Sequence, residues 1–228
     1  MATFVLVHGG WAGGWQWRQV AAQLRAAGHD VYTPTLTGLG ERVHLAHPDL
    51  DLDTHIQDIL MVLKYEDLQD VILVGYSYSG MVVTGVAERA PERLAQLVYL
   101  DAFVPRDGES LAMIFGPELS AAFEQAAQTY GNGWSVPLDP PDARHTPQPL
   151  NPSRQPLSVT NAAAARLPRT FIYCNQEKEA MGPVGTPITQ AAARAKSDGG
   201  WRYYELNTGH NPWETAPQEL TEILLSLA

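Results

Sequence analysis

The chain has 228 residues, of which 45% are hydrophobic and 18% charged, so it can bury one large core and leaves no room for two full-sized domains. Its 25 acidic and 15 basic residues give a formal charge of −10, which disfavours nucleic acid and anionic membrane surfaces as partners. The single cysteine, Cys174, excludes an internal disulfide, and no basic leader or long apolar run is present, so we expect one domain over residues 1–228 in the cytoplasm.

Short apolar runs of β-type residues recur along the chain and alternate with segments of helical spacing. Most runs are continuous rather than alternating, which is typical of strands buried on both faces. The alternation of the two patterns predicts a parallel sheet with helices on both of its faces. Strands are expected at 4–7, 31–32, 71–74, 97–100, 171–173 and 201–204, and helices at 17–24, 56–63, 81–89, 119–130 and 220–227.

The alternation breaks once, after the expected strand at 97–100. An amphipathic helix is expected at 119–130, and residues 130–156 that follow are crowded with proline, glycine and asparagine. So many breakers exclude a regular strand or helix there. Insertions that leave a sheet where its strands end commonly cover an active site. We therefore expect a cap insertion over approximately residues 105–167.

A serine lies at the apex of a predicted strand–turn–helix. The strand at 71–74 runs into Gly75-Tyr76-Ser77-Tyr78-Ser79-Gly80, and a helical segment follows. Such a nucleophile elbow needs small residues two before and two after the serine, because the turn presses these positions against its neighbours. Gly75 and Ser79 occupy them, although the second position is usually glycine. The pattern predicts that Ser77 is a nucleophile; the alternative is an ordinary turn with a surface serine.

The motif His8-Gly9-Gly10-Trp11 directly follows the first expected strand. In acyl transfer, a backbone N–H of this loop and the N–H of the residue after the nucleophile hold the developing oxyanion. This assigns the main-chain N–H groups of Gly10 and Tyr78 as donors. In isolation the motif would indicate only a tight turn, but its position relative to Ser77 favours the oxyanion loop.

A histidine follows the last expected strand, in Gly209-His210-Asn211. A triad needs its base on a loop at the carboxyl end of the sheet, where it can reach a serine at another strand's end. His210 is the one histidine so placed late in the chain, and we predict that it is the base. The other histidines lack the i, i+4 spacing of a helical zinc site, so no metal is expected.

Two carboxylates are candidates for the acid that orients the base. The chain order serine, acid, histidine places the acid after the strand at 171–173, where Glu177 is the first choice. Asp101 ends the strand at 97–100 and could also reach the histidine. Either residue could instead be a solvated charge or a turn cap. Geometry rather than chain order defines the role, so the sequence favours Glu177 only slightly over Asp101.

Apolar and aromatic side chains near these motifs are candidates for the walls of a substrate pocket. Trp11 and Tyr76 flank the oxyanion loop and the serine, and Trp213 follows the histidine loop. Each of these side chains could equally belong to the core. Further candidates are Tyr78 and, in the cap, Leu111, Met113, Ile114 and Phe115.

These segments together resemble the α/β-hydrolase superfamily, and most closely its small branch of plant methyl esterases, hydroxynitrile lyases and bacterial pyrethroid hydrolases. The resemblance spans nearly the whole chain and is weakest at 130–156. It implies a three-layer α/β/α sandwich with a mostly parallel six-stranded sheet, a short cap and no cofactor. Ser77, His210, Gly10 and Tyr78 match the nucleophile, base and oxyanion positions, whereas Glu177 and Asp101 fall at two alternative acid positions. The segments that carry it are His8-Gly9-Gly10-Trp11, the elbow, residues 35–40, residues 99–105 and Gly209-His210.

The sequence therefore favours a serine hydrolase that cleaves carboxylic esters of small to medium, fairly apolar molecules through an acyl-enzyme. A hydroxynitrile lyase is an alternative, but such lyases carry a lysine beside the histidine and a hydroxyl residue in the oxyanion loop, where this chain has Asn211 and Gly9. A ligand-binding module without catalysis is a second alternative, and the intact serine and histidine argue against it. The expected partner is a small-molecule ester, with no nucleic acid and no membrane.

Overall fold

The sheet at the centre of the molecule is parallel throughout. The structure is a computed structural model that describes residues 1–138 and 143–228. Within this part of the chain, six strands form one sheet in the order β2-β1-β3-β4-β7-β8, and every neighbouring pair is parallel. The prediction of a six-stranded parallel sheet is confirmed. Its strands are β1 (Thr3–Val7), β2 (Asp30–Tyr32), β3 (Val71–Tyr76), β4 (Leu94–Leu100), β7 (Arg169–Cys174) and β8 (Trp201–Leu206).

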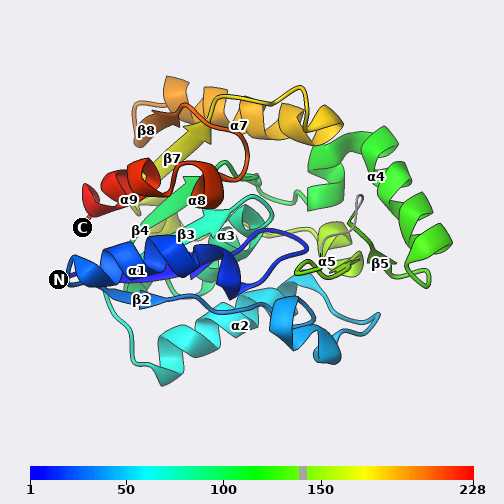
Figure 1. The fold of residues 1–228 in the computed structure, drawn as a ribbon, viewed down its shortest axis with the longest axis horizontal. Coiled ribbons are helices and arrows are strands. Elements are labelled where there is room, and N and C mark those ends of the chain that lie inside the picture. Colours follow the sequence, from blue (N-terminus) through cyan, green and yellow to red (C-terminus); the bar gives the residue numbers. More distant parts are fainter. Residues whose placement is uncertain (139–142) are drawn as a thin grey trace.

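Helices cover both faces of this sheet, so the fold has the three predicted layers (Figure 1). On one face, α1 and α9 bury Leu24 and Leu220 against the sheet, next to Trp17, which directly precedes α1. On the other face, α2, α3 and α7 contribute a second core that includes Ile56 and Ile188. The helices are α1 (Arg18–Ala26), α2 (Leu52–Tyr65), α3 (Ser79–Arg89), α7 (Gly185–Ser197), α8 (Pro212–Thr215) and α9 (Pro217–Leu225).

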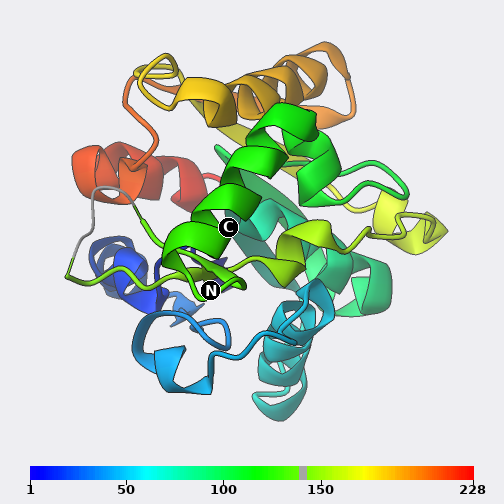
Figure 2. The same ribbon diagram turned by 90° about the vertical axis from the view of Figure 1, so that its right-hand side faces the viewer.

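Between β4 and β7 the chain leaves the sheet. The helix α4 begins at Leu111, earlier than expected. It is kinked at Gly116, which has a φ of 79° and directly precedes Pro117. Figure 1 places this segment at the end of the molecule opposite both termini, and Figure 2 shows α4 crossing that end. Its elements are α4 (Leu111–Tyr130), β5 (Ser135–Val136), β6 (Gln148–Pro149), α5 (Asn151–Arg154) and α6 (Ala162–Ala165), with β5 and β6 antiparallel.

Parallel strands end at the same edge of a sheet, so the loops that follow β1, β3, β4, β7 and β8 meet there. The segment between β4 and β7 lies over this edge (Figure 1). Gly10, Ser77, His210 and the two candidate acids, Asp101 and Glu177, belong to these loops. Among the described residues, no helix combines the length and the apolar character needed to cross a lipid bilayer.

Candidate active site

Ser77 occupies a tight turn between β3 and α3. Its φ of 54° lies in the left-handed region, and its carbonyl accepts hydrogen bonds from the N–H groups of Gly80 and Phe103 at 3.1 and 3.2 Å. A Cβ on Gly75 would lie 2.7 Å from the carbonyl oxygen of Ser79, and one on Gly80 would lie 1.9 Å from that of Phe103. Glycine is therefore required at both positions. Serine at position 79 is buried, and its hydroxyl donates to the carbonyl of His8.

The loops bring Ser77, His210 and Asp101 together. His210 Nε2 lies 3.0 Å from Ser77 Oγ, and His210 Nδ1 lies 2.6 Å from Asp101 Oδ2. An ionised carboxylate only accepts hydrogen bonds, so Nδ1 carries the proton that is donated to Asp101. Nε2 of the neutral ring is then the acceptor for the Ser77 hydroxyl. A serine, a correctly oriented base and a buried carboxylate thus form one continuous hydrogen-bonded chain.

Asp101 is fully buried, and four groups fix its side chain and backbone. The residue directly follows β4 with a φ of 44°, and its N–H donates to the carbonyl of Ile172 at 2.8 Å. Its Oδ1 accepts the N–H of Cys174 at 3.1 Å, while its Oδ2 is shared between His210 and the ammonium of Lys178. Lys178 is itself largely buried, with 14% of its side chain exposed, so it supplies a countercharge to the carboxylate.

Glu177 lies beside this chain of hydrogen bonds without joining it. The residue is exposed, and in the described part of the chain its carboxylate forms no hydrogen bond or ion pair. Its Oε2 lies 2.2 Å from where a Cβ on Gly209 would be, so the carboxylate rests on the backbone next to His210. The sequence slightly favoured Glu177 over Asp101 as the partner of His210, whereas in the structure His210 pairs with Asp101. The backbone turn after β4 aims Asp101 at the histidine, whereas the turn at Glu177, with φ 60°, leaves its carboxylate at the surface.

Gly10 and Tyr78, whose N–H groups are the expected oxyanion donors, lie close together, since a Cβ on Gly10 would lie 3.8 Å from the Cβ of Tyr78. On either side of Gly10, the N–H of Gly9 donates to Gln16 Oε1 at 3.2 Å and that of Trp11 to Gln148 Oε1 at 3.0 Å. In the described part of the chain the Gly10 N–H has no such partner. Tyr78 precedes the first turn of α3, where backbone N–H groups lack intrahelical acceptors. Both donors are therefore available to a ligand oxygen.

A buried histidine that the sequence analysis did not single out anchors the side chain of Tyr78. His55 on α2 is fully buried, and its Nε2 lies 2.9 Å from the carbonyl oxygen of Thr37. A carbonyl only accepts, so Nε2 carries the proton and Nδ1 accepts the Tyr78 hydroxyl at 2.7 Å. Burial lowers the pKa of His55 and raises that of Tyr78, which keeps both groups neutral. This network attaches the residue after the serine to α2.

A second buried histidine holds the oxyanion loop. His8 Nε2 accepts the N–H of Leu36 at 3.0 Å, so its Nδ1 carries the proton and donates to the carbonyl of Gly9 at 2.7 Å. Burial lowers the pKa of His8 to about 4, and the ring is neutral at physiological pH. The Ser79 hydroxyl donates to the carbonyl of His8 and so links this loop to the elbow.

The expected pocket walls divide into several environments. Tyr76 is buried, and its ring packs 5.0 Å from that of His210 while its hydroxyl donates to Asn211 Oδ1 at 2.8 Å. Trp213 packs edge-on against Trp15 with ring centroids 5.8 Å apart. Met113 is 63% exposed. Tyr76 therefore packs against the loop that carries His210, and Trp213 packs against Trp15 in the segment that precedes α1.

Four aromatic rings form an arc, of which the sequence analysis named only Trp11 and Phe115 as candidates for a pocket wall. Trp11 and Phe123 lie 6.0 Å apart, Phe123 and Phe115 lie 5.2 Å apart, and Phe115 and Phe103 lie 5.3 Å apart. The arc begins next to Gly10 and ends at the residue whose N–H binds the Ser77 carbonyl. It joins the segment between β4 and β7 to the loops that follow β1 and β4.

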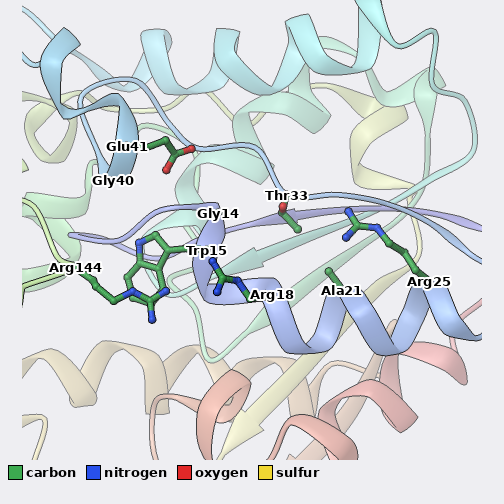
Figure 3. Close-up of a pocket in the computed structure, with 9 residues that line it drawn as sticks. All are labelled: Gly14, Trp15, Arg18, Ala21, Arg25, Thr33, Gly40, Glu41 and Arg144. Carbon is green, nitrogen blue, oxygen red and sulfur yellow. The ribbon is translucent and has the colours of Figure 1, made fainter.

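A separate surface cleft of about 580 Å³ lies beside α1 (Figure 3). Arg18 and Arg25 extend into it from α1, and Arg144 stacks on Trp15 with its guanidinium 3.9 Å from the ring centroid. The lining residues do not include Ser77. This cleft is therefore distinct from the hydrogen-bonded set described above.

Two features bear on metal and thiol chemistry. Among the described residues, no group of three or more histidine, cysteine, aspartate or glutamate side chains is arranged to hold a metal ion. Cys174 is buried at the end of β7, and burial raises the pKa of its thiol well above the usual value. A protonated, inaccessible thiol is unreactive.

Comparison with known proteins places the chain in a defined context. The model of the "Alpha/beta hydrolase family" matches residues 4–223. A carbendazim hydrolyzing esterase of Nocardioides sp. (strain SG-4G) is 40% identical over 100% of both chains, and a putative chloroplastic methylesterase 14 of Arabidopsis thaliana is 26% identical over 99% of this chain and 71% of its own. An extracellular α/β-hydrolase from a Paenibacillus species superposes with a TM-score of 0.79 and 25% identity, covering 99% of this chain and 98% of the other.

Proposed function

The chain belongs to the α/β hydrolase family, and we propose that within this family it is a carboxylic ester hydrolase that acts through a serine acyl-enzyme. The observation that carries the proposal is the hydrogen-bonded chain from Ser77 through His210 to Asp101. The 40% identity to an esterase over the full length of both chains supports the same reaction class. The resemblance noted from the sequence to an esterase branch of the superfamily agrees with this family membership.

In the proposed mechanism, His210 Nε2 takes the proton of the Ser77 hydroxyl as its oxygen attacks the ester carbonyl. The carbonyl oxygen becomes an oxyanion that accepts hydrogen bonds from the N–H groups of Gly10 and Tyr78. Asp101 holds the imidazole tautomer and stabilises the imidazolium that forms. The imidazolium then gives its proton to the leaving alkoxide, an alcohol departs, and an acyl group remains on Ser77.

Deacylation repeats these steps with water in place of the serine. His210 takes a proton from the water, the hydroxide attacks the acyl carbonyl, and the proton is returned to Ser77 as the carboxylic acid leaves. No step in this sequence needs an electron acceptor or a group carrier. The residues named above therefore suffice for the complete cycle.

We propose that the substrates are small to medium, fairly apolar esters. The arc formed by Trp11, Phe123, Phe115 and Phe103 supports this, because aromatic rings bind apolar groups by burial and stacking. We propose that an acyl or alcohol group of the substrate contacts this arc, which runs from Trp11 beside Gly10 to Phe103, whose N–H donates to the Ser77 carbonyl. The net charge of −10 also disfavours strongly anionic substrates. We further propose a cytoplasmic location, in keeping with the single buried cysteine.

Release of p-nitrophenol from short-chain p-nitrophenyl esters tests the proposed reaction. We expect turnover by the wild-type chain and a loss of roughly 10⁴-fold or more in Ser77→Ala. Ser197→Ala is the matched control, because it removes an exposed hydroxyl at the end of α7 that donates to the carbonyl of Arg194. Absence of turnover by the wild type would contradict the proposal. Cleavage of a cyanohydrin in preference to esters would indicate the lyase instead.

A further inference from the structure

Trp11 has a backbone conformation that is unusual for a bulky residue. Its φ is 60°, in the left-handed region that favours glycine. The residue directly follows Gly10, the proposed oxyanion donor. A conformation of this kind persists only where the surrounding structure holds it, and such positions are often found at functional sites. The contacts that hold Trp11 therefore bear on the geometry of the oxyanion hole.

All three polar groups of Trp11 are engaged by the segment between β4 and β7. Its N–H donates to Gln148 Oε1 at 3.0 Å, its carbonyl accepts the N–H of Thr146 at 2.8 Å, and its indole N–H donates to the carbonyl of Val136 at 2.7 Å. Its ring also packs 6.0 Å from that of Phe123 on α4. The cap thus forms a clamp on Trp11, which consists of Val136, Thr146 and Gln148.

Gln148 is the member of this clamp nearest to the proposed oxyanion donors. Its side chain is buried, with the whole residue 9% exposed. A Cβ on Gly10 would lie 3.4 Å from Gln148 Oε1 and 3.8 Å from the Cβ of Tyr78. The carboxamide of Gln148 and the two donor residues therefore meet in one small region.

The hydrogen bond from Trp11 to Gln148 fixes the peptide plane between Gly10 and Trp11. The N–H of Gly9 is fixed in turn by Gln16 Oε1 at 3.2 Å, on the core side of the loop. The Gly10 N–H lies between these two fixed peptide groups. The peptide that carries the Gly10 N–H is held at its carbonyl by His8 Nδ1, which donates to Gly9 at 2.7 Å, so without the outer anchor Gly10, with its wide backbone freedom, would be held from one side only. Misplaced donors bind the transition state less well than correctly placed ones.

We propose that the cap builds the oxyanion hole, and that Gln148 is a positioning residue that acts through the Trp11 N–H. This inference rests on the proposed function, because it assigns a role to Gly10 in ester hydrolysis. It makes docking of the cap a condition for catalysis as well as for covering the site. It also gives Trp11 a second role, as the attachment point of the cap, beside its place in the aromatic arc.

Gln148→Met tests the proposal, because methionine has a similar length and its thioether sulfur is a far weaker acceptor for the Trp11 N–H than an amide oxygen. We expect kcat for a p-nitrophenyl ester to fall about 10-fold or more while KM changes less than about twofold, as for an interaction made only in the transition state. The matched control is Gln128→Met on the exposed side of α4, where the glutamine donates only to the carbonyl of Gly133 at 3.5 Å. This control should keep the wild-type kcat.

Trp11→Phe provides a second variant, which removes the indole hydrogen bond to Val136 and keeps an aromatic ring. We expect it to lower kcat as well, and the loss in the double variant with Gln148→Met to be smaller than the product of the single losses, because both act on one residue. Losses that multiply would overturn the proposal. So would a wild-type kcat in Gln148→Met, or a raised KM at constant kcat. An inactive wild type would instead reject the ester hydrolase function itself.

Discussion

Replacement of Asp101 by asparagine removes the negative charge next to His210 with the smallest change of shape. In the wild type this charge stabilises the imidazolium that forms in the transition state. With the opposite charges centred about 4 Å apart and an effective dielectric constant of about 20, the attraction is about 4 kcal/mol. That energy corresponds to roughly 10³-fold in rate.

Lys178 moderates this estimate, because its ammonium shares Oδ2 of Asp101 with the histidine. We therefore expect Asp101→Asn to lower kcat by about 10²- to 10³-fold, with a much smaller change in KM. Glu177→Gln is the matched control, since it makes the same chemical change in a carboxylate that rests on Gly209 outside the hydrogen-bonded chain. It should keep kcat within about threefold of the wild type.

The assay is the initial rate of p-nitrophenyl ester hydrolysis at several substrate concentrations, with thermal unfolding measured for each variant. Loss of the carboxylate also leaves Lys178 without its countercharge, which by itself lowers stability. The double variant Asp101→Asn/Lys178→Met removes both charges, and we expect it to regain stability without regaining kcat. A larger kcat loss in Glu177→Gln than in Asp101→Asn would refute the reasoning, as would full recovery of kcat in the double variant.

Three further predictions concern buried groups around the site. Tyr78→Phe removes the hydroxyl that is anchored on α2, and it should lower kcat about 10-fold at nearly constant KM. The control Tyr99→Phe also loses a buried hydroxyl, and it should leave kcat within about twofold of the wild type. Equal effects of the two substitutions on kcat would contradict a positioning role for the Tyr78 hydroxyl. Burial lowers the pKa of His8 from 6.5 to about 4. As the pH falls through 6.5, the His8 ring therefore binds a proton in unfolded chains but not in folded chains. Stability is thus lost as the pH falls from 6.5 to about 4. We therefore expect the free energy of unfolding, measured with urea, to fall between pH 7 and pH 4.5, and to fall by about 2 kcal/mol less in His8→Asn than in the wild type. Identical falls in the two proteins would argue against a neutral buried ring. Native enzyme treated with iodoacetamide should keep its activity because the Cys174 thiol is buried and protonated, and rapid inactivation that substrate prevents would show otherwise.

The central sheet was predictable because each strand carries its own local signal. The run Val71–Val74 is apolar without alternation, and every residue of β3 is buried. The helix α7 gave no comparable signal. Its buried face consists of Ile188 and small residues such as Ala191, Ala192 and Ala195, which do not form a clear hydrophobic stripe. Local patterns therefore revealed the sheet but not this covering helix.

The acid next to His210 was not decided by the sequence, because β4 and β7 are neighbours and both end at the same edge of the sheet. Asp101 and Glu177 each follow one of these strands, so chain order alone cannot separate them. Backbone turns direct one carboxylate inward and the other to the surface. The clamp on Trp11 was equally inaccessible, since its partners lie 125 and 137 residues away in the chain.

The most direct test of the account is covalent labelling by a p-nitrophenyl phosphonate, which reacts with an activated serine and releases p-nitrophenol. The account predicts one phosphonyl group per chain in the intact mass, located on Ser77 by peptide mass spectrometry, and no label on Ser77→Ala. Loss of ester hydrolysis should follow labelling in proportion. Stoichiometric label on a different residue, or at least a tenth of wild-type hydrolysis in a clean preparation of Ser77→Ala, would contradict it.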